Sequence, residues 1–88
     1  MKTCFKPVFW RHIKKLTDQT LKQEVGQVIN SVENASRIKD IPNLKKLKGY
    51  KIAYRIKVSD YRIGLTIAKG TAIFIVCLPR KDIYTFFP

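Results

Sequence analysis

Residues 50–78, which read YKIAYRIKVSDYRIGLTIAKGTAIFIVCL, decide the fold of this 88-residue chain. Apolar and polar side chains alternate over residues 50–58 and again over residues 61–67, which is the two-residue period of a β-strand. A third and almost wholly apolar run follows over residues 71–78. Two short polar dipeptides separate the three runs, as in β-hairpins. The stretch therefore predicts three consecutive antiparallel strands.

Upstream of these strands the apolar period changes to that of an α-helix. Residues 2–6 are predicted to form a short edge strand, and Pro7 sets the start of a first helix. Thr17 or Asp18 is expected to cap a second helix. The apolar stripe of that helix consists of Leu21, Val25, Val28, Ile29 and Val32. Residues 37–43 are expected to form an irregular connector.

The order of these elements predicts an α+β fold. Two N-terminal helices pack on a small antiparallel sheet in the order β-α-α-β-β-β, followed by a short C-terminal helical turn within residues 80–87. Eighty-eight residues are enough for one compact domain, so residues 1–88 are expected to be a single domain.

Hairpin geometry predicts which side chains share a face of the sheet. If Ser59–Asp60 is a two-residue turn, Lys57 lies opposite Arg62, and Arg55 lies opposite Gly64. The apolar residues of the first two strands then face the helices: Ile52, Tyr54, Ile56, Val58, Tyr61, Ile63 and Leu65. If Lys69–Gly70 is the second turn, three aliphatic or thiol side chains fall beside Arg62 and Gly64 as an exposed patch for a partner: Ile73, Ile75 and Cys77.

The charge of the chain points to a polyanionic partner. Eighteen Lys and Arg stand against six Asp and Glu, a net charge of +12, and ten of the basic but only two of the acidic residues lie in residues 44–88. Self-repulsion of like charges opposes a compact fold, so a partner such as nucleic acid is the economical explanation. A membrane partner is not expected, because no helix concentrates the Lys and Arg on one face.

Cysteine and histidine usage predicts neither a metal site nor a disulfide framework. Cys4 and Cys77 match no metal-ligand spacing, and both lie in apolar, strand-like contexts that favour buried free thiols in a reducing compartment. His12 is expected to be a surface residue of the first helix. The first ten residues lack the apolar core of a secretory signal, so we expect a cytoplasmic protein without a cofactor.

Three cations share the face of the sheet that the helices leave open. Arg55, Lys57 and Arg62 would repel one another there, and a bound phosphate would turn that repulsion into attraction. Such residues are also common on the solvated side of a two-faced sheet, so the pattern alone leaves both interpretations open. Arg80 follows the third strand and can join the cluster, and Tyr84 offers a ring on which a base could stack.

The same residues resemble the RelE family of toxin–antitoxin systems, within the RelE/ParE superfamily. The resemblance rests on Leu47-Lys48-Gly49, Tyr54-Arg55-Ile56-Lys57-Val58, Asp60-Tyr61-Arg62-Ile63 and Arg80-Lys81-Asp82-Ile83-Tyr84. It covers residues 44–84, about half of the chain, and is specific as a combination.

The resemblance implies a ribosome-dependent endonuclease that cleaves mRNA. In this family the 2′-hydroxyl of one nucleotide attacks the neighbouring phosphate, leaving a cyclic phosphate and a free 5′-hydroxyl. It implies catalytic roles for Arg55, Lys57, Arg62, Arg80 and Tyr84. Lys57, crowded by Arg55 and Arg62, is the candidate base. Further lysines are assigned to RNA binding: Lys45, Lys46, Lys48, Lys51 and Lys81. The partners implied are mRNA, the ribosome and a cognate antitoxin, with no membrane and no small-molecule cofactor.

One position departs from the family pattern. Pro79 stands where many members carry a histidine before the Arg-Lys-Asp-Ile-Tyr segment, which leaves the acid and base roles open. Two alternatives remain from the sequence. One is a ParE-like inhibitor of DNA gyrase on the same fold, which would not need the cationic cluster. The other is a non-catalytic RNA-binding module, although a double-stranded RNA-binding domain places a long helix after its sheet.

Overall fold

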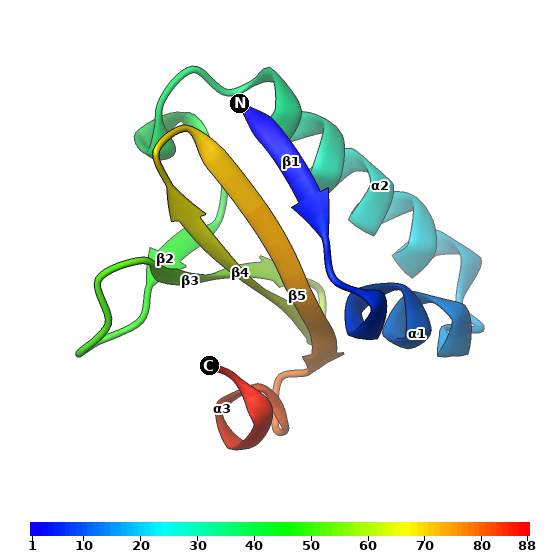
Figure 1. Ribbon diagram of the computed structural model, residues 1–88. Helices are drawn as coiled ribbons and strands as arrows, with labels where there is room; N and C mark the ends of the chain where they lie inside the picture. Colours follow the sequence, from blue (N-terminus) through cyan, green and yellow to red (C-terminus); the bar gives the residue numbers. More distant parts are fainter.

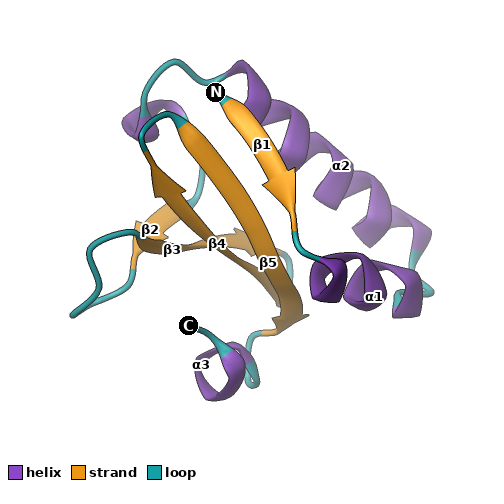
Figure 2. Cartoon of the chain, viewed as in Figure 1, coloured by secondary structure: helices purple, strands orange, loops and turns teal.

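The computed structural model describes residues 1–88 as a five-stranded sheet with two helices on one face and a short helix on the other (Figures 1 and 2). The elements in chain order are β1 (Lys2–Phe5), α1 (Pro7–Lys15), α2 (Gln19–Asn34), the 3₁₀ turn η1 (Ile38–Asp40), β2 (Leu44–Lys46), β3 (Ala53–Val58), β4 (Tyr61–Ala68), β5 (Thr71–Pro79) and α3 (Ile83–Phe86). The strand order across the sheet is β1-β5-β4-β3-β2.

The predicted α+β class is confirmed, and the sheet differs from the prediction in two details. β1 is an edge strand as expected, but it pairs with β5 in parallel, so the sheet is mixed. The two helices carry the chain from β1 at one edge of the sheet to β2 at the other edge. The antiparallel strands then lead back across the sheet to β5, and this long connection permits parallel pairing of β5 with β1. The three-residue strand β2 was not predicted, because its sequence Leu-Lys-Lys is too short to show a period.

Local sequence explains both long helices. Pro7 occupies the first turn of α1, where its missing N–H costs nothing. Asp18, and not Thr17, caps α2: its carboxylate accepts hydrogen bonds from the N–H groups of Thr20 and Leu21 at 2.9 and 3.2 Å. The apolar stripe of α2 packs on the sheet as predicted. Neither helix has the length and apolar character that a bilayer span requires.

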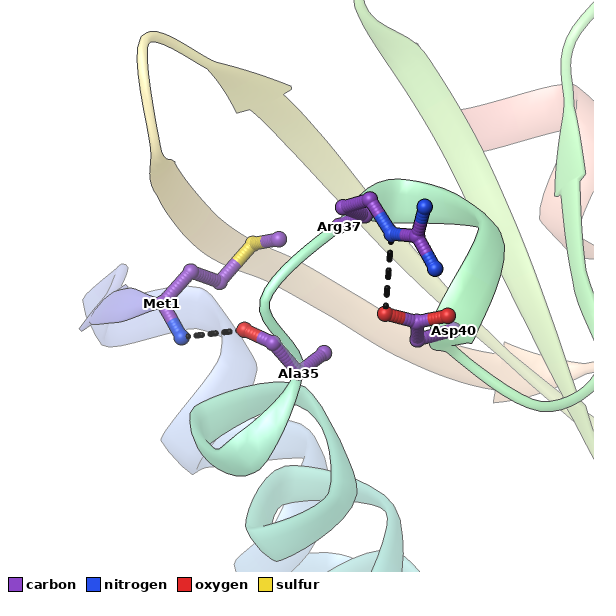
Figure 3. A network of polar contacts seen from close by, with 4 residues as sticks. All are labelled: Met1, Ala35, Arg37 and Asp40. Atoms are coloured by element: carbon purple, nitrogen blue, oxygen red, sulfur yellow. Dashed lines mark hydrogen bonds and ion pairs between the residues drawn. The ribbon is translucent and has the colours of Figure 1, made fainter.

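The N-terminal amino group caps the far end of α2. The ammonium of Met1 donates to the carbonyl oxygens of Glu33 and Ala35 at 2.7 and 2.8 Å. Figure 3 shows the contact with Ala35. A positive charge there satisfies carbonyls that the helix leaves unpaired and complements the helix dipole. Beside it, Arg37 and Asp40 form an ion pair across η1 with a distance of 3.5 Å between Nε and Oδ2 (Figure 3).

The β3–β4 hairpin has the predicted register. Val58 pairs with Tyr61 across the Ser59–Asp60 turn, Lys57 with Arg62, and Arg55 with Gly64. The apolar side chains of both strands therefore join the main core beneath α1 and α2. Ile52 is the exception: it precedes β3, is 47% exposed and does not face the helices as predicted.

A β-bulge in β5 overturns the predicted partner patch. The register of β4 and β5 shifts between Gly64 and Leu65, so that Ile75 becomes an extra residue. Beyond the bulge every side chain changes face: Cys77 pairs with Ile63 in the main core, and Val76 takes the place beside Gly64. The expected exposed patch of Ile73, Ile75 and Cys77 is therefore wrong, because Cys77 is only 2% exposed and the other two are half-buried.

A second, smaller core covers part of the open face of the sheet. It consists of Leu47, Ala53, Val76, Ile83 and Phe87, and thus joins α3 to β3 and β5. Gly64 lies under it without room for a side chain: a Cβ atom there would lie 2.7 Å from ring atoms of Phe87 and from a methyl of Val76. Glycine at this position lets the C-terminal segment pack directly on the sheet.

The Gly64→Ala substitution should destabilise the protein by about 1–3 kcal/mol, because the added methyl must push the Phe87 ring off the sheet. Gly26→Ala is the matched control. Gly26 lies inside α2 with open space where a methyl group would point, and alanine there should stabilise the helix by about 1 kcal/mol. Urea unfolding of the two variants should show shifts of opposite sign; equal shifts would contradict the close packing at Gly64.

Candidate active site

Five side chains from three parts of the chain line one cavity of about 370 Å³ on the face opposite α1 and α2. These are Arg55 and Lys57 of β3, Arg62 of β4, Arg80 after β5, and Tyr84 of α3. We refer to this cavity as the cationic groove. All five residues assigned to catalysis from the sequence therefore lie together, although 29 positions separate the first from the last in the sequence numbering.

Arg55 is held at the side of the groove nearest β2. Its Nη1 donates to the carbonyl oxygen of Asn43 at 3.3 Å. Its Nε is buried and has no hydrogen-bond partner, and no other buried side-chain nitrogen or oxygen is in this state. A buried donor without a partner costs about 1–3 kcal/mol. Lys57 is exposed and makes no hydrogen bond through its side chain.

Arg62 is the only charged residue that the fold buries, with 8% of its surface exposed. Its Nη1 donates to the carbonyl oxygens of Ser59 and Tyr61 at 2.9 and 2.8 Å. The guanidinium therefore holds the β3–β4 turn closed while its charge lies in the groove. The sequence predicted the place of Arg62 but not this structural role.

The C-terminal part of the groove is anchored on the same turn. The backbone N–H of Arg80 donates to the carbonyl oxygen of Asp60 at 2.7 Å. Arg80 and Tyr84 also line a second cavity of about 620 Å³ together with Lys81 and Asp60. Tyr84 is 64% exposed, so its ring is available to a ligand.

No carboxylate neutralises the cations of the groove. The single ion pair of the structure joins Arg37 and Asp40, far along the chain from the groove residues. Lys57 and Arg62 lie directly opposite each other across the hairpin, an arrangement that destabilises a sheet. An unneutralised cluster of this kind is suited to a phosphate group.

The lysines assigned to RNA binding do not all lie at the groove. Lys45 pairs with Arg55, so both side chains point to the same face of the sheet. Lys81 lines the second cavity. Lys46 pairs with Tyr54 and points to the opposite face, and Lys48 and Lys51 lie in the exposed loop between β2 and β3.

His12 is not the simple surface residue that the sequence predicted. It is half-buried between α1 and β5, and its Nδ1 accepts a hydrogen bond from the backbone N–H of Cys77 at 3.1 Å. Burial lowers the pKa of His12 below its usual 6.5, and the charges of Lys15 and Arg11 lower it further. Burial also raises the pKa of the Cys77 thiol to about 12, so this cysteine stays a neutral core residue. No signal in the sequence marked this pair, because the contact spans 65 positions.

Comparison with known proteins identifies the family. No protein-family model matches the chain. Toxin RelE3 of Methanocaldococcus jannaschii is 35% identical over 89 residues, an alignment that covers all of both proteins. The chain belongs to the RelE toxin family. The resemblance predicted from residues 44–84 is thereby confirmed and extends over the whole chain.

Solved structures of RelE proteins share the fold. A chain of the RelB–RelE antitoxin–toxin complex from Methanococcus jannaschii has a TM-score of 0.80 and 32% identity, over 97% of this RelE chain and 99% of that one. A chain of the RelE–RelB complex from Pyrococcus horikoshii has a TM-score of 0.74 over 93% and 97% of the two chains. Its 14% identity supports the fold alone.

The His12 contact predicts a pH-dependent stability. Protonation of His12 is disfavoured in the folded state, so the unfolded chain binds a proton more readily below its ordinary pKa of 6.5. The contribution of His12 to the free energy of unfolding should therefore be at its maximum above pH 6.5. It should decrease as the pH falls from 6.5 toward the lowered pKa of the folded state. His12→Asn keeps an acceptor but does not titrate. Urea unfolding at about pH 7.5 and about pH 5.5 should show a larger loss in the wild type than in this variant; equal losses would rule out a contribution from His12.

Proposed function

We propose that this RelE protein is an endoribonuclease that cleaves mRNA on the ribosome and is neutralised by a cognate antitoxin. The observation that carries the proposal is the cationic groove: four basic side chains and one exposed tyrosine converge there without a neutralising carboxylate. A phosphodiester has the charge and size to occupy such a groove, and membership of the RelE family makes RNA the expected substrate.

The reaction proposed is an internal transesterification. The 2′-oxygen attacks the adjacent phosphorus, the bond from phosphorus to the 5′-oxygen breaks, and a 2′,3′-cyclic phosphate and a 5′-hydroxyl result. Lys57, which lies opposite Arg62 in the groove, is proposed to take the proton of the 2′-hydroxyl through its neutral amine and to become an ammonium. Arg55, Arg62 and Arg80 stabilise the negative charge that accumulates on the phosphate oxygens.

No histidine lines the groove that could donate a proton to the leaving 5′-oxygen. Pro79 stands at the position of the family's histidine. His12 does not line the groove, and its Nδ1 is engaged by the backbone N–H of Cys77. Water in the open groove is therefore assigned as the source of this proton. Cleavage by this chain should accordingly be slower than by family members that carry the histidine.

Tyr84 is proposed to hold the substrate by stacking. Its ring is 64% exposed at the mouth of the groove, and base–aromatic stacking contributes about 1–3 kcal/mol per base. Lys45 and Lys81, which lie nearest the groove residues, are proposed to act on the RNA backbone there. Lys46, Lys48 and Lys51 are exposed outside the groove and would contact RNA beyond it. These contacts would strengthen binding without selecting a sequence.

An antitoxin is the second proposed partner. The Methanococcus jannaschii relative was solved as an antitoxin–toxin complex with RelB. A net charge of +12 favours an acidic partner, and covering the cationic groove would block access to RNA.

The double substitution Lys57→Ala, Arg80→Ala should abolish RNA cleavage, with a loss of at least about 100-fold, because it removes the proton acceptor and one phosphate contact. Neither side chain forms a hydrogen bond or ion pair in the fold, so the variant should remain folded. The measurement is primer extension on a reporter mRNA in a coupled translation extract. Lys14→Ala, an exposed charge on α1 outside the groove, is the control and should cleave like the wild type.

New 5′ ends within the translated frame, seen with wild type and control but not with the double variant, would support the proposed nuclease. Intact mRNA together with stalled DNA replication would instead favour a gyrase inhibitor of the ParE type. Intact mRNA without stalled DNA replication would contradict both the nuclease and the gyrase inhibitor. It would favour the remaining alternative, a protein that binds RNA but does not cut it.

Tyr84→Phe separates the two properties of this tyrosine. If stacking is its role, the phenylalanine variant should keep at least about half of the wild-type cleavage rate, while Tyr84→Ala should lose about 10- to 100-fold. Rates from single-turnover cleavage of the same reporter provide the measurement. A phenylalanine variant as inactive as the alanine variant would show that the hydroxyl takes part in proton transfer.

A further inference from the structure

A separate cavity of about 360 Å³ adjoins the cationic groove at Lys57. It lies between α2, the connector before β2 and the β3–β4 turn, and Lys57 lines both spaces. Its volume falls in the range of roughly 300–1,000 Å³ that is usual for small-molecule sites. No role in the proposed cleavage uses it.

The walls of this cavity combine apolar surface with polar side chains that are open to solvent and so to a ligand. Val28, Ile41 and Val58 supply the apolar surface. The polar side chains are those of Glu24, Gln27, Ser31, Asn43 and Ser59, and none of them forms a hydrogen bond through its side chain within the protein. Polar side chains of this kind can fix the orientation of a bound ligand.

Glu24 and Lys57 line the same cavity but do not form an ion pair. The cavity thus offers an acceptor-only carboxylate at Glu24 and opens at Lys57 onto the arginines of the cationic groove. An acidic peptide would meet repulsion from Glu24. A nucleotide fits both groups, because its base carries N–H donors and its phosphate carries the negative charge.

We propose that this cavity binds the base of an RNA nucleotide whose phosphate lies in the adjoining cationic groove, and that Glu24 selects guanine. Guanine is the base with two adjacent donors, N1–H and N2–H, which match the two oxygens of one carboxylate. Uracil, cytosine and adenine place an acceptor beside their donor, and that acceptor faces the carboxylate unfavourably. Gln27 or Ser31 can donate to the guanine O6 from the same helix.

This base preference rests on the proposed function and adds a selected nucleotide to the cleavage site. Its test does not depend on cleavage, because mononucleotides that lack a scissile bond probe the cavity directly. Guanosine 3′-monophosphate and uridine 3′-monophosphate carry the same phosphate, so a difference in affinity between them reports the base alone.

The experiment is a titration of the full chain with each of the two mononucleotides, followed by NMR of the backbone amides. The wild type should bind the guanosine nucleotide at least about 10-fold more tightly than the uridine nucleotide, which corresponds to one bidentate contact to a base. The shifted amides should include those of Gln27 and Ser31. Glu24→Gln should reduce the preference to near unity.

Glu33→Gln is the matched control. Glu33 lies on α2 outside the cavity, and the substitution makes the same change of charge, so the guanine preference should persist. Equal affinity for the two nucleotides in the wild type, absence of binding, or shifts confined to the cationic groove would each overturn the proposal.

A cleavage assay distinguishes this inference from the nuclease proposal. Mapping cut sites on a reporter RNA should show guanine enriched beside the cut with the wild type and with Glu33→Gln, and a flat distribution with Glu24→Gln. A wild type that binds guanosine 3′-monophosphate in the cavity but cuts no RNA would refute the nuclease alone. Cleavage without any base preference would refute the cavity's role and leave the nuclease standing.

Discussion

The register of the β3–β4 hairpin determines where every functional side chain of the sheet lies. With Val58 opposite Tyr61, alternation sends Arg55, Lys57 and Arg62 to the face that α1 and α2 leave open. A slip by one residue would exchange these cations with the main core, which no fold of this size could tolerate. The guanidinium of Arg62 strengthens this register by binding two carbonyl oxygens of the turn. The same residue thus stabilises the hairpin and supplies charge to the groove.

The second constraint is the bulge in β5, which lets the C-terminal segment complete the groove. The extra residue at Ile75 turns Val76 toward the open face, where Phe87 and Ile83 pack on it and on Gly64. This small core carries α3 and therefore Tyr84. The hydrogen bond from Arg80 to Asp60 fixes the other end of the segment. The position of Tyr84 in the groove therefore depends on the packing of Phe87 against Val76 and Gly64.

The side chains of the groove are arranged in a way that lowers the stability of the fold. Its cations oppose one another without carboxylates, and the Nε of Arg55 is buried without a partner. Sequences usually avoid both costs, and sites that break local rules are where binding is expected. Both costs would decrease when RNA binds, because a phosphate neutralises the cations and offers acceptor oxygens to Arg55.

The sequence alone determined the hairpin, the helix starts and the faces of β3 and β4, because period, proline and capping residues act over a few positions. It also brought the five residues of the groove together through the family pattern. Only the tertiary structure decided the parallel pairing of β1, the bulge at Ile75 and the contact of His12 with Cys77. The β1 pairing and the His12 contact join segments that are distant in the chain. The bulge lies within a hairpin, but it places Val76 against Ile83 and Phe87, and no local pattern records that packing. The cavity beside Lys57 belongs to this second group, because its walls meet only when α2 packs on the sheet.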